Sequence, residues 1–240
     1  MDIEKLIREV RIEIDNGPIG TVFDVTGALE HSLLTVDLDE KTVIEACKQA
    51  RRYNIAALCL PPYYVRTASQ LLRGSGVAVC ASIGVPNAVV SSEAKRADAR
   101  YSLLSGANEL DVCINSHAIK SGRMEEAFND LIEIVQMAKD KAIVKAAIEM
   151  AIFKGDEVKK TLYMIKESGA AFVKIQNVLS GKAADPADIK FVKELLGNNV
   201  RIKIDGGVKT PEKAKELVSA GADRIGLTAT FDIAGKIEGR

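Results

Sequence analysis

The sequence predicts a TIM (β/α)8 barrel with an extra N-terminal helix, and three observations lead to this prediction. In three places an amphipathic segment is followed by Gly-Ala and then by a short apolar run. The Gly-Ala units come directly after Ser105, Ser168 and Ala220. Glycine ends a helix because it adopts the left-handed conformation without steric cost, so each repeat predicts a helix followed by a strand. About eight such strands can be counted, and the 240 residues match the size of an eight-unit barrel.

Each expected strand is a short apolar run. The runs lie near Leu29–Leu34, Ala56–Leu60, Val77–Ile83, Glu109–Asn115, Ile143–Glu149, Phe172–Gln176, Arg201–Asp205 and Arg224–Leu227. Amphipathic segments fill the gaps, for example Asp39–Arg52, Met124–Lys139, Asp156–Ser168 and Thr210–Ala220. Helices that alternate with strands are typical of a parallel sheet.

The chain contains no Pro/Gly/Ser-rich linker, so we expect a single domain over residues 1–240. The barrel proper is expected at about 28–235, with Asp2–Glu13 as the extra helix in front of it. A doubly wound open sheet is the competing fold. It is less favoured because no G-x-G-x-x-G follows the first expected strand.

Composition argues against several classes of function. The chain is 47% hydrophobic, and its 33 basic residues equal its 33 acidic residues. A balanced charge without a basic block argues against a nucleic-acid partner. No apolar run approaches the ~20 residues of a membrane span, and the charged start does not resemble a signal peptide. We therefore expect a small-molecule partner, with no nucleic acid and no membrane.

Cysteine and histidine show no metal-binding pattern. The cysteines are Cys47, Cys59, Cys80 and Cys113. None forms a C-x-x-C pair, so buried, reduced thiols of a cytoplasmic protein are the favoured interpretation and a nucleophilic thiol the less favoured one. His31 and His117 lack metal-ligand spacing, so no metal site is expected. We expect a structural hydrogen bond for His31 and a loop position for His117.

Four consecutive expected strands have one aliphatic face and one charged face. Side chains alternate across a strand, so in ELDVCIN the residues Leu110, Val112 and Ile114 oppose the polar positions. The aliphatic faces must meet the helices, and the charged faces then point into the barrel. The inward charged set is Asp111, Lys145, Glu149, Lys174, Lys203 and Asp205. Burying an unpaired charge costs several kcal/mol, so these groups are expected to pair.

A charged interior has two interpretations that the residues leave open. One is a structural ion-pair network, although apolar packing often gives more stability. The other is catalysis, since barrel enzymes react at the C-terminal ends of their strands. Lys174 and Lys203 lie on adjacent expected strands, and burial or a nearby cation lowers the pKa of an amine. One amine is then expected to be neutral near pH 7 and to attack a carbonyl, with Asp111 transferring protons.

Short motifs carry these residues in a fixed order along the chain. GANELDVCIN contains Asp111, GAAFVK contains Lys174 and RIKIDGGVKT contains Lys203, while LEHSLL, AALCLPPYYV and KAAIE complete the series. Singly these motifs are weak, but together they resemble the deoxyribose-phosphate aldolase family from about Leu29 to Thr228. That family consists of class I Schiff-base aldolases on a TIM barrel.

The resemblance implies an activity and a set of roles. Lys174 matches the Schiff-base lysine, Lys203 the second lysine and Asp111 the catalytic aspartate. The implied reaction is the reversible cleavage of 2-deoxyribose 5-phosphate to acetaldehyde and glyceraldehyde 3-phosphate, without a cofactor or metal. Lys203 is implied to assist proton transfer and to lower the pKa of Lys174. A homodimer is the assembly that the family suggests.

Three segments differ from the family's pattern, all where substrate and phosphate are expected. The segment IQNV follows the Schiff-base lysine in place of Thr-Ser-Thr-Gly, Asp205 replaces a small residue before Gly206-Gly207, and GLTA replaces Gly-Thr-Ser-Ser at the eighth strand. Backbone N–H groups at Gly206, Gly207 and near Thr228 can still hold an anion. These three residues, with Asp205 and Asn177, are the expected substrate contacts.

Asp205 leaves the substrate open, because a carboxylate repels a nearby phosphate. Either Asp205 points away from the phosphate or the ligand differs. One alternative is a Schiff-base aldolase of the same family that acts on a different, non-phosphorylated aldehyde or ketone. The other is a barrel that binds a sugar phosphate without catalysis.

Overall fold

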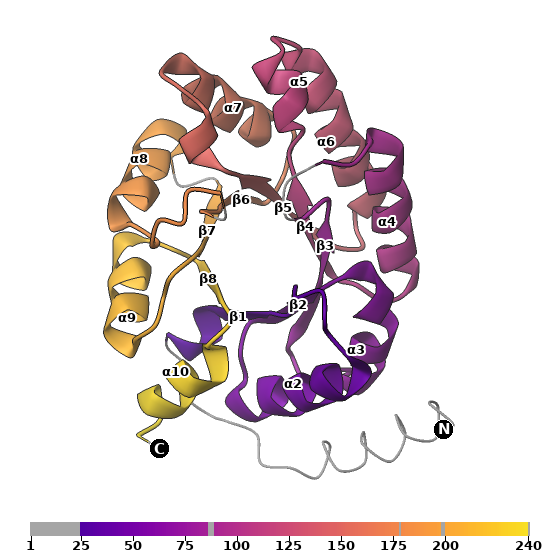
Figure 1. Cartoon of the computed structure of the whole chain (residues 1–240), viewed down its shortest axis with the longest axis vertical. Coiled ribbons are helices and arrows are strands. Elements are labelled where there is room, and N and C mark those ends of the chain that lie inside the picture. Colours follow the sequence, from indigo (N-terminus) through magenta and orange to yellow (C-terminus); the bar gives the residue numbers. More distant parts are fainter. Residues whose placement is uncertain (1–24, 86–88, 178, 198–199, 240) are drawn as a thin grey trace.

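The fold is a closed barrel of parallel strands inside a ring of helices (Figure 1). The computed structural model describes residues 25–85, 89–177, 179–197 and 200–239. Within them the strands follow the chain order from β1 to β8, and β8 pairs with β1 to close the ring. The predicted TIM barrel is confirmed, whereas the helix expected at Asp2–Glu13 lies outside the described residues.

The secondary structure alternates between strand and helix. The strands are β1 (Leu29–Ser32), β2 (Ala57–Leu60), β3 (Ala78–Ile83), β4 (Glu109–Cys113), β5 (Ile143–Ile148), β6 (Phe172–Ile175), β7 (Arg201–Asp205) and β8 (Arg224–Leu227). The helices are α2 (Glu40–Tyr53), α3 (Val65–Leu71), α4 (Ser92–Leu104), α5 (Ser116–Lys120), α6 (Met124–Ala138), α7 (Asp156–Glu167), α8 (Pro186–Leu196), α9 (Pro211–Ala220) and α10 (Thr230–Ile237). Short 3-10 turns occur at η1 (Thr26–Ala28), η2 (Pro62–Tyr64) and η3 (Met150–Ile152).

Strands β4 and β5 end earlier than the apolar runs predicted. Asn115 lies beyond β4 because it caps α5, where its side chain accepts a hydrogen bond from the Ala118 backbone N–H at 3.0 Å. This cap places His117 in a short helix, so the expectation of a loop position was wrong. Glu149 likewise leaves β5 and precedes η3.

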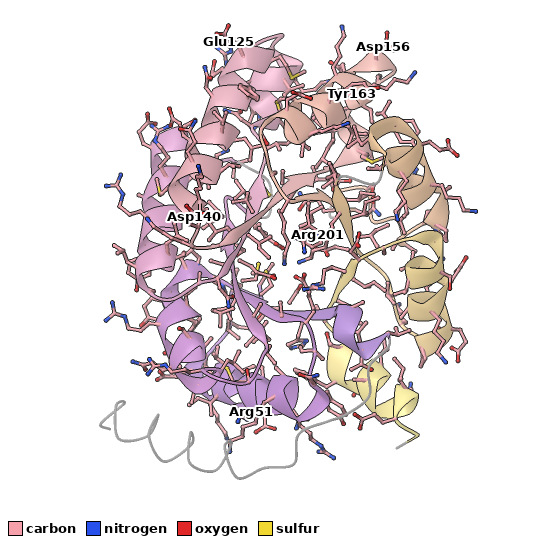
Figure 2. All side chains as sticks on the ribbon, turned by 180° about the vertical axis from the view of Figure 1, so that it is seen from behind. Arg51, Glu125, Asp140, Asp156, Tyr163 and Arg201 are labelled. Atoms are coloured by element: carbon pink, nitrogen blue, oxygen red, sulfur yellow. The ribbon has the colours of Figure 1, made fainter. Side chains whose placement is uncertain are left out.

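The strands separate two environments, as their alternation predicts. Outward residues such as Val173, Ile175 and Ile202 belong to the buried apolar layer between strands and helices. Inward residues carry the charges. At the N-terminal end of the strands, the Arg201 guanidinium lies 4.2 Å from the centre of the Phe172 ring, and Figure 2 shows Arg201 near the middle of the ring of strands. No helix within the described residues is long and apolar enough to cross a membrane.

His31 joins the start of the barrel to its last helix. Its Nδ1 lies 3.0 Å from Thr230 Oγ1, and its ring packs 4.3 Å from that of Phe231. The Thr230 hydroxyl donates to the Leu227 carbonyl at 2.9 Å, so His31 Nδ1 must be the donor in the first bond. The structural hydrogen bond expected for His31 is confirmed. Burial lowers the pKa of His31 to about 4, because the charged imidazolium would lose its hydration.

We predict that His31 makes the protein less stable in mild acid. Unfolding would return its pKa to about 6.5, so the unfolded chain binds more protons between about pH 4 and 6.5. The free energy of unfolding should therefore fall, by up to about 3 kcal/mol, as the pH drops through this window. Urea unfolding at several pH values measures it. His31→Gln should flatten the slope, while His117→Gln, at an exposed position, should not; equal slopes in all three proteins would contradict the prediction.

Candidate active site

Alternate residues of the strands bring their charged groups together in one buried cluster. Within the described residues its carboxylates are Glu30, Glu109, Asp111 and Asp205, and its cations are Lys145, Lys174, Lys203 and Arg224. Strands β1 and β4 to β8 supply these groups from their inward faces, whereas β2 and β3 contribute none. Each of these groups lies within 4.0 Å of an opposite charge, so the expected pairing is confirmed for the inward charged set with the exception of Glu149.

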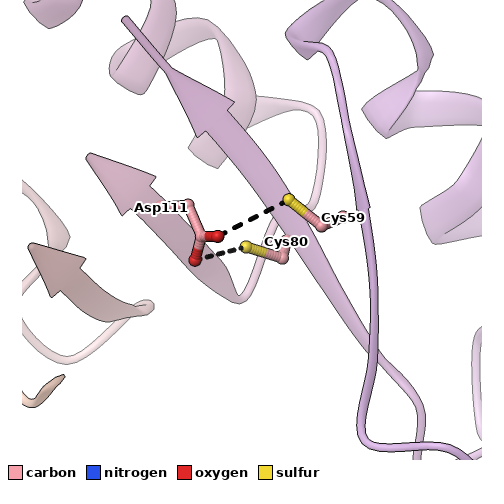
Figure 3. Close-up of side chains that lie close together, drawn as sticks. All are labelled: Cys59, Cys80 and Asp111. Atoms are coloured by element: carbon pink, nitrogen blue, oxygen red, sulfur yellow. Dashed lines mark hydrogen bonds between the residues drawn. The ribbon is translucent and has the colours of Figure 1, made fainter. Parts of the chain in front are cut away.

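Asp111 of β4 lies at the centre of the cluster. Its Oδ2 accepts from both Lys174 Nζ and Lys203 Nζ at 2.7 Å. The Cys80 thiol donates to Oδ1 at 3.1 Å and the Cys59 thiol is 3.7 Å from Oδ2 (Figure 3). The register Lys174↔Lys203 places the two amines on neighbouring strands at the same level. One carboxylate therefore orients both lysines.

Glu30 of β1 completes the arrangement from the opposite side of the barrel. It accepts from Lys145 Nζ at 2.7 Å and from Lys203 Nζ at 2.5 Å. Glu109 lies 2.5 Å from Lys145, and Arg224 Nε lies 3.4 Å from Glu30. Lys203 is thus shared by two carboxylates, Glu30 and Asp111, and Lys145 is held by Glu30 and Glu109.

Asp205 of β7 points at Lys174, with 2.9 Å between Oδ2 and Nζ. Its Oδ1 lies 4.0 Å from Lys203 Nζ. A methyl group on Gly226 of the adjacent strand β8 would come within 2.0 Å of Oδ1, so the glycine provides the space for this carboxylate. The charge of Asp205 is therefore directed toward the lysines and compensated by them.

The electrostatics correct one expectation about Lys174. Burial alone would lower its pKa, but the Asp111 and Asp205 carboxylates outweigh burial and the neighbouring Lys203, and hold the pKa of Lys174 above its usual value. The same balance places the pKa of Lys203 well above its usual value, chiefly through Asp111 opposing burial. The expectation of an amine kept neutral by a cationic neighbour was wrong, because the carboxylates contact the amine directly.

Asp111 itself stays ionised. Burial acts to raise its pKa, but the ammonium groups of Lys174, Lys203 and Lys145 hold the pKa well below the usual value. The resting site therefore contains a protonated Lys174 in contact with an ionised Asp111, and Asp205 lies 2.9 Å from the same amine. Any reaction at the Lys174 nitrogen must begin with transfer of its proton to another group.

Sequence reasoning placed most of these residues but missed some. Glu149 belongs to the mouth of the barrel, where its Oε2 accepts from the Leu179 backbone N–H at 2.9 Å, and not to the ion cluster. Glu30 was missed, although alternation in LEHS places it opposite Leu29 and His31, which meet the helices. The role of the thiols at Asp111 had no signal in the sequence, since it depends on pairing between distant strands.

The expected substrate contacts lie at the C-terminal end of the strands. Gly206 and Gly207 have φ values of +121° and +64°, which side chains rarely adopt. A methyl group on Gly207 would also come within 3.0 Å of Ala183. Beside Gly206 lies Asn177, whose buried Nδ2 has no hydrogen-bond partner in the described part of the chain. Thr228 is exposed directly after β8.

A cavity of about 280 Å³ opens on the same side. Its lining residues are Val89, Cys113, Ile114, Ser116, His117, Lys120, Ala147, Glu149, Ile152, Gln176 and Leu179. Cys113 and Gln176 are the next inward residues after Asp111 and Lys174. The cavity therefore lies on the C-terminal side of the Lys174 amine along the barrel axis. Glu149 Oε1 is buried and has no hydrogen-bond partner among the described residues. The cavity therefore offers space for a small ligand and an acceptor for a hydroxyl group.

The sulfur and oxygen ligands near Asp111 suit a hydrogen-bond network better than a metal ion. Cys59, Cys80 and Asp111 lie close enough to share an ion. However, two ammonium groups already bind Asp111, and a metal ion there would be repelled by both. Burial raises the pKa of the Cys80 thiol well above its usual value, so it stays protonated and donates to the carboxylate.

Comparison with characterised proteins identifies the family. The chain is 33% identical to a deoxyribose-phosphate aldolase of Clostridium novyi (strain NT) over 205 residues, which cover 85% of this chain and 92% of that protein. It is 31% identical to that of Geobacillus sp. (strain WCH70) over 217 residues, covering 90% and 96%. This chain belongs to the deoxyribose-phosphate aldolase family. No protein-family model matches this sequence.

Solved structures agree with membership in the aldolase family. The aldolase QR15 superimposes with a TM-score of 0.85 at 28% identity, covering 91% of this chain and 98% of that one. A tetrameric deoxyribose phosphate aldolase from Aeropyrum pernix gives a TM-score of 0.81 at 26% identity, covering 96% and 97%. The resemblance inferred from the motifs is thus confirmed over most of the chain.

We predict that Glu30→Gln strongly destabilises this aldolase-family barrel. The change removes a buried charge from between Lys145 and Lys203, which costs about 3–5 kcal/mol when one partner of a buried pair is lost. Urea unfolding measures the free energy. Glu216→Gln is the matched control, because Glu216 makes a 2.8 Å ion pair with Lys213 at the surface and should cost about 1 kcal/mol or less. Similar losses in both variants would contradict the prediction.

Proposed function

We propose that this chain is a class I aldolase that forms a Schiff base on Lys174. Its reaction is the reversible cleavage of 2-deoxyribose 5-phosphate to acetaldehyde and glyceraldehyde 3-phosphate. The observation that supports this proposal is one buried amine held at 2.7 Å by Asp111, with a second amine on the same carboxylate oxygen. The curated relatives are named for the same activity.

In the synthetic direction, Lys174 attacks acetaldehyde and water leaves, so that a protonated imine forms. The positive imine nitrogen withdraws electrons, and the neighbouring methyl carbon loses a proton to give an enamine. The enamine carbon then attacks the aldehyde of glyceraldehyde 3-phosphate and forms the new carbon–carbon bond. Hydrolysis of the product imine releases 2-deoxyribose 5-phosphate and restores the amine.

Asp111 and Lys203 assist the proton transfers of this cycle. Asp111 is within hydrogen-bond distance of Lys174, and Lys203 shares the same Oδ2. Their positions are set by Glu30 and the two thiols, which leave little freedom for rotation. A group already placed for transfer avoids the entropic cost of being brought there during the reaction.

The substrate contacts are assigned to the residues above the amine. The backbone at Gly206, Gly207 and near Thr228 holds the phosphate, and Asn177 donates to a substrate oxygen. Asp205 lies on the amine side of this group, and its pairing with Lys174 weakens the objection that it would repel the phosphate. Deoxyribose 5-phosphate is therefore favoured over a non-phosphorylated substrate.

The proposed function also indicates the metabolic role, the location and the assembly of the protein. The enzyme acts on small molecules in carbohydrate catabolism, and the four free, buried cysteines agree with a cytoplasmic location. A homo-oligomer is proposed for its assembly. A homodimer is the simplest form, and the relative from Aeropyrum pernix is tetrameric.

We predict that Lys174→Ala abolishes aldol cleavage, because no other group replaces the nucleophilic nitrogen. Activity on 2-deoxyribose 5-phosphate is measured through the acetaldehyde released. Borohydride added with acetaldehyde should attach one ethyl group to the wild-type peptide that contains Lys174. Lys174→Arg is the control for charge, since it keeps a cation between the carboxylates. It should stay folded and remain inactive.

Three results would contradict this proposal. Substantial cleavage by Lys174→Ala, or an ethyl group on a different lysine, would remove the assigned nucleophile. Cleavage of free deoxyribose at a rate equal to that of the phosphorylated sugar would contradict the substrate. A panel of free and phosphorylated aldehydes as acceptors measures this last point directly.

A further inference from the structure

Two carboxylates hold the Lys174 ammonium, and they differ in what else they bind. Asp111 is fully buried, and its Oδ2 also accepts from Lys203 while its Oδ1 accepts from Cys80. Asp205 contacts Lys174 through Oδ2, and its Oδ1 has no hydrogen-bond partner among the described residues. The side chain of Asp205 is 19% exposed. The oxygens of Asp111 are both engaged in hydrogen bonds, whereas Asp205 has one buried oxygen, beside Gly226, that accepts none from the described residues.

This difference decides which group can accept the first proton of the cycle, the one on the Lys174 ammonium, while Asp111 and Lys203 stay assigned to the later transfers. A proton on Asp111 would weaken its hydrogen bonds with Lys203 and the Cys80 thiol. The ammonium groups around Asp111 also hold its pKa well below the usual value. A proton on Asp205 disturbs the contact with Lys174, which must in any case be broken, and otherwise only the longer 4.0 Å ion pair with Lys203.

The space for Asp205 is built into the next strand. Gly226 does not have a positive φ, so its backbone conformation does not require glycine. A side chain there would collide with Asp205, whose Oδ1 would lie 2.0 Å from the added carbon. The pair Asp205 and Gly226 therefore acts as one feature, in which the glycine lets the carboxylate reach Lys174.

We propose that Asp205 is the catalytic acid–base group for Schiff-base formation, an inference that rests on the proposed function. Asp205 takes a proton from the Lys174 ammonium, which gives a carboxylic acid and a neutral amine. The amine nitrogen forms a bond to the carbonyl carbon, and after proton transfer from nitrogen to oxygen a neutral carbinolamine results. Asp205 then returns its proton to the carbinolamine hydroxyl, which leaves as water. The products are a protonated imine and the original carboxylate.

A purely electrostatic role for Asp205 makes the opposite prediction. The charged groups that face Asp205 are Lys174 of β6 and Lys203 of β7, with Asp111 of β4 beyond them, while β8 presents the uncharged Gly226. If Asp205 only raised the pKa of Lys174, its removal would give more neutral amine and faster imine formation near neutral pH. If Asp205 transfers the proton, its removal slows imine formation there.

The experiment measures the rate of imine formation with acetaldehyde, stopped with borohydride at several pH values. Asp205→Asn should slow the rate about 100-fold or more near neutral pH. Its rate should also rise steadily with pH, because hydroxide must then remove the proton, whereas the wild-type rate should level off. Asp205→Ala should regain part of its rate when formate is added. Glu125→Gln, which removes a charge at an exposed position of α6, should match the wild type.

Gly226→Ala gives an independent variant that keeps every charge. It displaces the Asp205 carboxylate and should slow imine formation in the same direction. Equal or faster imine formation by a folded Asp205→Asn protein, or no effect of formate on Asp205→Ala, would overturn the inference while the proposed function stands. A wild-type protein that forms no imine would overturn both.

Discussion

The buried contact between Asp111 and two lysines is the constraint on which the site depends. An ionised carboxylate inside a barrel is stable only if cations replace its lost hydration, and Lys174 and Lys203 do so at 2.7 Å. The same contact charges the lysine that is proposed to act as a nucleophile. The arrangement thus fixes the amine in position and at the same time creates the need for a proton acceptor.

The barrel makes this concentration of charge possible. Aliphatic residues on the outward faces of the strands form the apolar layer against the helices. The inward faces are not needed for this packing and can carry charged residues. The closed ring brings Glu30 of β1 within hydrogen-bond distance of Lys203 of β7. Balanced charges in the interior keep the cost of burial within limits, although an apolar interior would cost less. A charged interior that is less stable than an apolar one is typical of an active site.

The tertiary structure shows where the residues that differ from the family's pattern lie. Asp205 in place of a small residue suggested repulsion of a phosphate, but its carboxylate contacts Lys174 at 2.9 Å. Gly226 on the adjacent strand provides the space for it. The remaining changes, around Asn177 and Thr228, lie directly after β6 and β8, where we propose that the substrate is held. This chain therefore has a second carboxylate, Asp205, at the lysine that we propose as the nucleophile.

The sequence by itself determined the barrel, the inward direction of its charges, and the family, because alternation along a strand and glycine at the end of a helix are local properties. It also placed Lys174, Lys203 and Asp111 in order. Only the tertiary structure decided which charges touch, since Glu30 reaches Lys203 across 173 positions of the chain. The direction in which the pKa of Lys174 shifts also depends on the tertiary structure, because it follows from distances of a few ångströms to Asp111 and Asp205 that no local pattern encodes.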